Sequence, residues 1–178
     1  MTVVPSATGA PGRTLDAETA QRVRFVAIDV DGVLTDGGIF LGDVDGRRME
    51  FKKYDIQDGL GILLLRWAGI KVGIITGRVS ESVALRAAEL KVDELVQDEH
   101  ARKLPALIKI CKRLGIGLDE VAFIGDDLPD VGVLRAVGLP VVVQRHRERG
   151  ELRHAPADAP RRRRGRAGVL RAPVARPR

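Results

Sequence analysis

The chain has 178 residues and carries 30 Lys and Arg against 24 Asp and Glu, for a formal net charge of +6 at pH 7. This length fits one domain with a sizeable buried core. No apolar run reaches the roughly 18 residues of a membrane span, the N-terminus does not resemble a secretory signal and the single cysteine, Cys111, excludes an internal disulfide, so we expect a cytoplasmic protein without a membrane partner.

The positive charge is concentrated at the end of the chain. Residues 145–178 contain 12 Arg and three acidic residues, a net charge of +9, whereas residues 1–144 have a net charge of −3. Such Arg-rich runs are usually solvated and disordered. A basic tail can also bind nucleic acid, with an affinity that falls steeply with salt. A nucleic-acid-binding protein is therefore an alternative, although the acidic body does not favour nucleic acid as a partner.

The first third of the chain predicts a strand followed by a hairpin. Residues 1–14 are rich in Gly, Pro, Ser and Thr, and we expect them to be disordered, with a short helix over 15–22. Residues 25–28 are apolar without interruption, which is typical of a central parallel strand. Two short strands around Asp45-Gly46 then predict a β-hairpin within 38–53.

The middle of the chain alternates between helical and strand patterns. The predicted elements are, in chain order, a helix over 58–68, a strand over 71–75, a helix over 80–90, a strand over 94–97, a helix over 103–114, a strand over 121–124, a helix over 129–136 and a strand over 139–143. This alternation predicts a Rossmann-like, three-layer α/β fold with a mostly parallel sheet. After Gln144 the periodicity stops.

Polar side chains collect where the predicted strands end, which is where open parallel sheets bind ligands. The group comprises five carboxylates, one hydroxyl and one ammonium: Asp29, Asp31, Asp126, Asp127, Asp130, Thr76 and Lys103. Carboxylates packed this closely repel one another unless a cation lies among them. A small set of oxygen ligands favours Mg²⁺ over Zn²⁺. Together with a lysine and a hydroxyl, such a site suits a phosphoryl group.

The first pair of carboxylates suggests a reaction. Asp29 at a strand tip can attack phosphorus directly, and Asp31, two residues later, can transfer protons to the leaving group and from water. Phosphoryl transfer to a carboxylate followed by hydrolysis is phosphatase chemistry. A phospho-receiver module gathers the same residue types but places its acceptor Asp after a middle strand. The order of motifs here favours the phosphatase.

Four motifs in order resemble those of the haloacid dehalogenase-like phosphatases. They are Asp29–Thr35 (DVDGVLT), Thr76-Gly77-Arg78, Lys103 and Gly125–Asp130 (GDDLPD). Together with the hairpin, Asp58-Gly59 and the run IITGR, they are similar to one small branch, the 3-deoxy-D-manno-octulosonate 8-phosphate (KDO 8-phosphate) phosphatase family. The resemblance covers about residues 23–143.

The resemblance implies a role for each matching residue. Asp29 would be the nucleophile and an Mg²⁺ ligand, and Asp31 the general acid/base and a ligand through its backbone carbonyl. Asp126 would bind Mg²⁺ directly. Asp127 and Asp130 would not touch the metal but would support the residues that bind it.

The phosphoryl group would be held by Thr76, Gly77 and Lys103. The segment before Lys103 is about one residue longer than is common in the family, which leaves Arg102 as an alternative. Arg78 could bind the carboxylate of a sugar acid in a bidentate manner, or simply lie on the surface.

The resemblance also implies substrate and assembly. The expected activity is Mg²⁺-dependent release of phosphate from KDO 8-phosphate through an aspartyl-phosphate, in lipopolysaccharide KDO biosynthesis. Another sugar-acid phosphate, such as a nonulosonate 9-phosphate, is the alternative substrate. No segment of 23–144 is long enough for a cap domain, and capless members form homotetramers through the hairpin, here 37–53.

The resemblance ends near Gln144. The family continues with a segment around Asn-Ala, a strand like Tyr-Val-Thr and a Gly-rich end that reaches a neighbouring subunit's active site. Codons for Gln144–His146 and for Leu152–His154 can encode Asn-Ala and Tyr-Val-Thr one base later. We therefore hypothesise a frameshift near Gln144, and expect 145–178 to lack the last edge strand of the sheet and the lid between subunits.

Overall fold

A computed structural model describes residues 17–144 and 151–154. The expectations for residues 1–14 and for most of the tail lie outside this part of the chain. The described part begins with a short helix, α1 (Ala17–Arg22), close to the predicted one. Its longest helices, α2 and α4, have 12 residues each and fall short of a membrane span.

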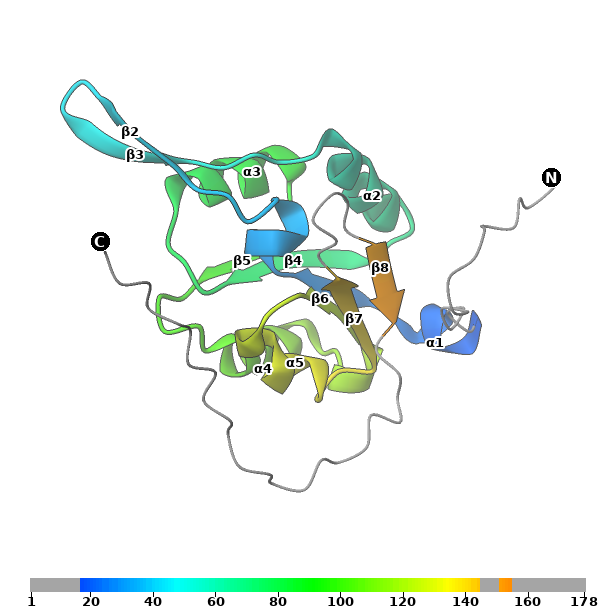
Figure 1. Ribbon diagram of the computed structural model, residues 1–178. Helices are drawn as coiled ribbons and strands as arrows, with labels where there is room; N and C mark the ends of the chain where they lie inside the picture. The colour runs from blue at the N-terminus through cyan, green and yellow to red at the C-terminus, as the bar shows by residue number, and fades with distance from the viewer. Residues whose placement is uncertain (1–16, 145–150, 155–178) are drawn as a thin grey trace, which may run out of the picture.

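A six-stranded sheet in the order β5-β4-β1-β6-β7-β8 forms the centre of the fold (Figure 1). Its strands are β1 (Phe25–Ile28), β4 (Lys71–Thr76), β5 (Glu94–Gln97), β6 (Val121–Gly125), β7 (Leu139–Gln144) and β8 (Glu151–His154). The first five are parallel, and β1 lies between β4 and β6. All four residues of β1 are buried because helices cover both faces of the sheet. The predicted α/β fold is confirmed.

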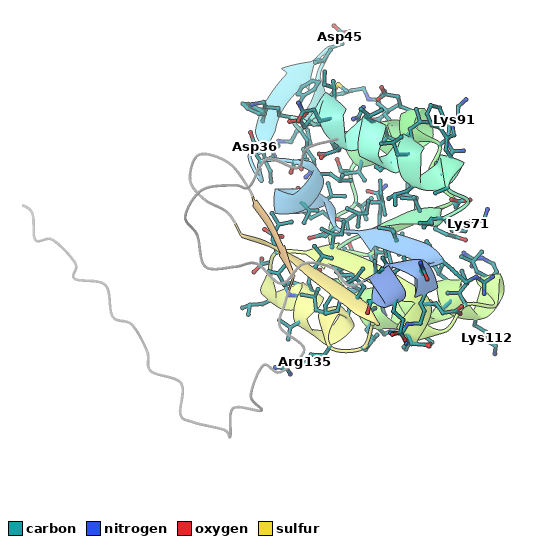
Figure 2. All side chains as sticks on the ribbon, turned by 90° about the vertical axis from the view of Figure 1, so that its right-hand side faces the viewer. Asp36, Asp45, Lys71, Lys91, Lys112 and Arg135 are labelled. Carbon is teal, nitrogen blue, oxygen red and sulfur yellow. The ribbon has the colours of Figure 1, made fainter. Side chains whose placement is uncertain are left out.

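Two helical layers complete the fold, one on each face of the sheet (Figure 1). Successive side chains of a strand point to opposite faces, so Phe25 packs with Leu107 and Ile110 of α4 (Lys103–Leu114). Val26 packs on the other face, against α2 (Ile56–Trp67) and α3 (Glu81–Leu90). Figure 2 shows side chains filling both layers, while the exposed Lys71, Lys91 and Lys112 reach outward.

Helix boundaries follow local capping chemistry. Helix α2 begins at Ile56, two residues before the predicted start, because the Asp55 carboxylate accepts a hydrogen bond from the Gln57 amide at 2.8 Å. The predicted helix over 129–136 is instead a 3₁₀ turn, Leu128–Asp130, followed by the short α5 (Val131–Leu134). This tighter turn carries Asp130 back toward the end of β6.

The hairpin stands apart from the main sheet as a two-stranded ribbon, β2 (Phe40–Val44) and β3 (Arg47–Phe51) (Figure 1). Its turn residues, Asp45 and Gly46, have φ values of 52° and 75°. Two left-handed residues give the turn a twist that matches the strands. The predicted hairpin is confirmed, with Asp45 at its outer tip (Figure 2).

One expectation about the tail is wrong. Residues 151–154 were expected to lack regular structure, but they form β8, which pairs antiparallel with β7 from Val141↔His154 to Gln144↔Glu151. Without β8, the outer edge of β7 would have unpaired backbone N–H and C=O groups. A returning segment can form hydrogen bonds with these groups whatever its side-chain pattern. The edge strand is therefore present within the described part of the chain.

Close packing around β4 predicts a sensitive glycine. A Cβ added at Gly73 would lie 2.6 Å from the ring of buried Phe25, whereas nothing lies within 4 Å of a Cβ at Gly61 on α2. We expect Gly73→Ala to lower the free energy of unfolding by about 1–3 kcal/mol, and Gly61→Ala not to lower it. Urea unfolding of both variants checks this, and equal stability would contradict the packing.

Candidate active site

The site begins where β1 ends. Asp29 is buried, and its amide donates to the Ile124 carbonyl at 2.9 Å. The chain then turns sharply: Asp31 has non-helical dihedral angles, and Gly32 has a φ of 96° that favours glycine. The Thr35 hydroxyl holds this turn by accepting from the Gly32 amide at 3.4 Å and donating to the Val30 carbonyl at 3.3 Å. The turn directs Asp29 and Asp31 to the carboxyl edge of the sheet.

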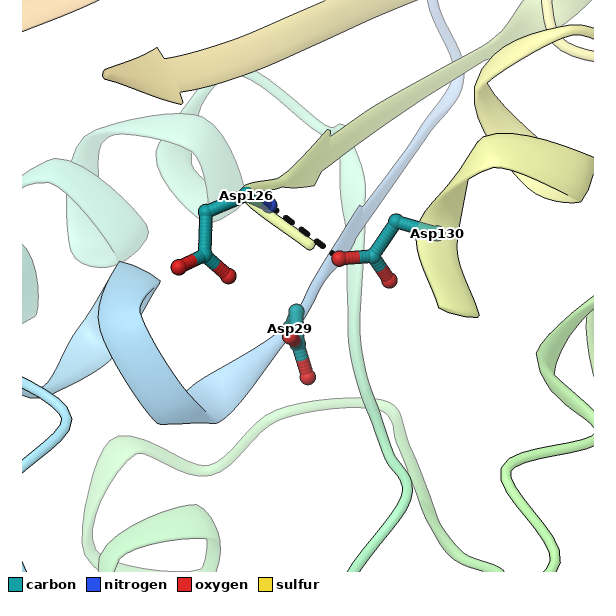
Figure 3. Close-up of side chains that lie close together, drawn as sticks. All are labelled: Asp29, Asp126 and Asp130. Atoms are coloured by element: carbon teal, nitrogen blue, oxygen red, sulfur yellow. Dashed lines mark hydrogen bonds between the residues drawn. The ribbon is translucent and has the colours of Figure 1, made fainter. Parts of the chain in front are cut away.

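Three carboxylates meet at this edge (Figure 3). Asp29, Asp126 and Asp130 each offer an oxygen, and these oxygens lie within 4.8 Å of one another. Asp130 is fully buried, and its Oδ2 accepts from the amides of Asp126 at 3.1 Å and Asp127 at 3.2 Å. An added Cβ at Gly125 would lie 2.6 Å from the Asp130 carboxyl carbon, so only glycine fits there. We call these three residues the carboxylate trio.

Lys103 supplies a cation to the carboxylate trio. Its Nζ lies 2.8 Å from Asp29 Oδ1 and 2.6 Å from Asp130 Oδ1, and its side chain is almost fully buried at the start of α4. Arg102 instead pairs with Asp98 at 2.8 Å, and its side chain is 65% exposed. The structure thus brings Lys103 into the site and leaves Arg102 outside.

Burial and charge oppose each other at these groups. Burial raises the pKa of Asp29 from 3.8 to about 6, Lys103 opposes the rise, and Asp130 adds to it. Burial acts to lower the pKa of Lys103, but the two carboxylates outweigh it and hold that pKa above its ordinary value. One ammonium therefore does not offset three carboxylates. A hard divalent cation fits the remaining negative charge and the all-oxygen donor set.

The second motif lies beside the first. Thr76 ends β4, is buried, and its hydroxyl accepts from the Arg78 amide at 3.4 Å. A Cβ at Gly77 would approach that of Ala101 to 2.9 Å, so the loop before Lys103 packs directly on this turn. Thr76 and Gly77 therefore lie where β1, β4 and the start of α4 converge.

Arg78 and Asp127 do not join the carboxylate trio. The Arg78 guanidinium donates to Glu50 Oε2 at 2.7 Å, and its Nε lies 3.9 Å from Asp31 Oδ2. Asp127 is exposed, and its Oδ1 accepts from the Leu128 amide at 2.7 Å. Asp127 thus caps the 3₁₀ turn, and Arg78 lies at the outer side of the site.

Sequence reasoning missed two residues of the hairpin. Lys52, just after β3, binds Asp31 through its ammonium and lies 3.3 Å from Glu50 Oε1. Burial alone would raise the pKa of Glu50, but hydrogen bonding to Arg78 and the nearby Lys52 hold it below its ordinary value. The alternation of β3 could have revealed them, since Glu50 and Lys52 share one face and Phe51 takes the other.

Removing the buried Lys103 ammonium should destabilise the protein, because Asp29 and Asp130 would then repel each other. Lys103→Met leaves Asp29 and Asp130 buried without their cation, and we expect a loss of about 3–5 kcal/mol in the free energy of unfolding of the metal-free protein. Arg102→Met should change it little, because that ion pair is solvent-exposed. Denaturant unfolding in EDTA measures both variants, and the reverse ranking would place the functional cation at Arg102.

Comparison with known proteins agrees with this geometry. A family model described as haloacid dehalogenase-like hydrolase matches residues 39–138. The chain is 40% identical over 124 residues to the 3-deoxy-D-manno-octulosonate 8-phosphate phosphatase KdsC of Escherichia coli K12, covering 70% of this chain and 64% of that protein. It is 38% identical over 126 residues to KdsC of Yersinia pestis, covering 71% and 65%. The chain thus spans just under two thirds of these relatives.

Solved structures that resemble this chain include phosphatases of the same name. A phosphatase of this name from Moraxella catarrhalis, crystallised with magnesium, phosphate and KDO, has a TM-score of 0.65 and 41% identity, covering 71% of this chain and 70% of that one. The enzyme from Yersinia pestis has a TM-score of 0.65 and 38% identity, covering 71% and 66%.

Proposed function

Because the chain belongs to the haloacid dehalogenase-like hydrolases, we propose that it is a Mg²⁺-dependent phosphatase that releases phosphate from KDO 8-phosphate. The observation that carries this proposal is the carboxylate trio with Lys103 bound to its nucleophile candidate, Asp29. The similar protein from Moraxella catarrhalis, crystallised with magnesium, phosphate and KDO, supports the metal and the substrate. We place the reaction in the cytoplasm, in the supply of KDO for lipopolysaccharide.

Asp29 is suited to attack phosphorus. Its carboxylate lies at the tip of a buried strand, and Lys103 fixes Oδ1. Asp29, Asp126 and the backbone carbonyl of Asp31 would hold Mg²⁺, which when bound neutralises charge on the phosphoryl oxygens and favours the carboxylate form of Asp29. Thr76, Gly77 and Lys103 would hold the phosphoryl group during transfer, with Asp127 and Asp130 keeping the turn after β6 in place.

Asp31 is suited to move protons. It follows Asp29 by two residues and is about one quarter exposed, so it can reach both a leaving oxygen and an entering water. In the first step protonated Asp31 would give its proton to the sugar oxygen that leaves, so that the sugar departs as a hydroxyl. In the second step the Asp31 carboxylate would take a proton from the water that hydrolyses the aspartyl-phosphate, which frees the Asp29 carboxylate and returns Asp31 to its acid form.

Arg78 is our candidate for recognising the sugar acid. Its guanidinium is 48% exposed and already donates to one carboxylate oxygen, Glu50 Oε2, and a substrate carboxylate could accept from the same group. Exchange of Glu50 for the substrate would place the ligand at the outer side of the site, near Asp31. The relatives found in the comparisons favour KDO 8-phosphate over a nonulosonate 9-phosphate.

Phosphate release from a panel of sugar-acid phosphates tests this function. We expect turnover of KDO 8-phosphate with Mg²⁺, its loss in EDTA, and a decrease of at least about 10³-fold in Asp29→Asn, because the nucleophile is removed. Asp119→Asn, on a surface turn remote from the motifs, is the matched control. Turnover that survives Asp29→Asn, or a preference for a nonulosonate 9-phosphate, would refute the mechanism or the substrate, respectively.

The hairpin is our candidate for assembly into a homotetramer through 37–53. Its register places Phe40 opposite Phe51 and Val44 opposite Arg47. Three large apolar side chains of one hairpin face, Phe40, Val44 and Phe51, are all exposed, Phe40 to 59%. Exposed apolar faces of this kind mark protein contacts, and a second copy of the same ribbon would cover them.

Polar substitution tests the assembly. We expect the wild type to be tetrameric in light scattering and Phe40→Ser/Phe51→Ser to dissociate, because the covered apolar area is lost. Ile108→Ser removes a comparably exposed apolar side chain from α4, across the sheet, and should leave the tetramer intact. A wild-type monomer would contradict the proposal.

The domain limits complete our proposal. Residues 23–144 would form the capless phosphatase domain after an N-terminal extension, 1–22, with β8 added to its sheet from the basic tail, 145–178. A frameshift near Gln144 also stays a proposal, and sequencing the gene across codons 144–154 checks it.

A further inference from the structure

A buried lysine of the hairpin has no part in the chemistry described so far. The Lys52 side chain is 0% exposed, its ammonium binds Asp31 Oδ1, and it lies 3.3 Å from Glu50 Oε1. An ammonium is buried only with charged or hydrogen-bonding partners that repay its lost hydration. Lys52 has two carboxylates for this purpose, and one of them is the proposed proton-transfer group.

The hairpin delivers Lys52 to this place by simple alternation. Side chains along a strand point to opposite faces in turn, so Glu50 and Lys52 face the body while Phe51 between them faces outward with its partner, Phe40. The same ribbon therefore presents an apolar face to its surroundings and a charged face to the site. Any shift of register by one residue would exchange the two faces.

Asp31 is contacted by two cations of different character. Lys52 binds Oδ1 and is fully buried, whereas Arg78 lies 3.9 Å from Oδ2 and is half exposed. Arg78 also binds Glu50 and is our candidate for the substrate's carboxylate, so a bound ligand would draw it away from Asp31. Lys52 has no access to solvent and would stay on Asp31 through the reaction.

We infer that Lys52 is a positioning residue, whose buried ammonium holds the Asp31 carboxylate in the orientation needed for proton transfer. This inference rests on the proposed function, in which Asp31 acts as general acid and base. Without Lys52, the carboxylates of Asp31 and Glu50 would face each other with no buried cation between them, and Asp31 would rotate away from the reacting oxygen. The ion pairs of Lys52 do not involve the carboxylate trio, so metal binding should not change.

Steady-state kinetics of Lys52→Met on KDO 8-phosphate test the inference. We expect kcat and kcat/KM to fall together, by about 10-fold or more, because an interaction needed only in the transition state is lost. Lys53→Met is the matched control, since Lys53 is the exposed neighbour, and it should behave as the wild type. A normal kcat with a raised KM would instead make Lys52 a substrate-binding residue and overturn the inference.

A second substrate separates proton transfer from general damage. p-Nitrophenyl phosphate has a leaving group that departs without protonation, so a misplaced general acid affects it little. We expect Lys52→Met to lose much less kcat/KM on this ester than on KDO 8-phosphate, because kcat/KM reports the step in which the leaving group departs. An equal loss on both esters would overturn the positioning role.

A double variant separates positioning from folding. Lys52→Met/Glu50→Gln removes the facing charge together with the ammonium, so we expect its melting temperature to return toward that of the wild type while kcat stays low. Recovery of both quantities would show that Lys52 acts only on stability and would overturn the inference. A wild type without phosphatase activity would refute the proposed function itself, whereas an active wild type matched by Lys52→Met refutes only the inference.

Discussion

The structure depends on one electrostatic conflict at the edge of a parallel sheet, where two buried carboxylates, Asp29 and Asp130, share the Lys103 ammonium beside the half-buried Asp126. Lys103 bridges Asp29 and Asp130, and the second oxygen of Asp130 takes two backbone amides of the turn after β6. These bonds fix the ends of β1 and β6 and the start of α4 relative to one another. The excess of carboxylates over ammonium groups at the carboxylate trio suits the site to a divalent cation and a phosphoryl group. The elements that we propose to bind the ligand are thus the elements that these ion pairs hold together.

The hairpin shows how a short insertion can serve two purposes. Strand alternation gives it an apolar face with Phe40 and Phe51 and a charged face with Glu50 and Lys52. If a second copy covers the first face, as we propose, assembly would hold the second face against Asp31. The register of the ribbon then matters for the site, because one residue of slippage would exchange the faces.

The carboxyl-terminal strand illustrates the limit of side-chain patterns. Glu151–His154 contains one apolar residue and reads as part of an Arg-rich tail. It nevertheless joins the sheet beside β7, because the free edge of β7 offers backbone hydrogen bonds that do not depend on side chains. Helix ends show the same local control: Asp55 starts α2 early, and the 3₁₀ turn at Leu128–Asp130 shortens the helix expected there.

The sequence by itself determined the layered α/β fold, the hairpin and the residues at the strand tips, because apolar periodicity, turn residues and strand ends are local properties of the chain. It also placed Asp29, Thr76 and Asp126 at one edge, since parallel strands share their carboxyl ends. Only the tertiary structure decided that Lys103 and not Arg102 enters the site, that Asp127 caps a turn outside it, and that Lys52 reaches Asp31. The placements of Lys52 and Lys103 depend on contacts between residues that are 21 and 27 positions apart. Alternation along β3 shows which face of the hairpin Lys52 takes, but the contacts themselves are set by how the helices and the hairpin pack on the sheet, which no local pattern encodes.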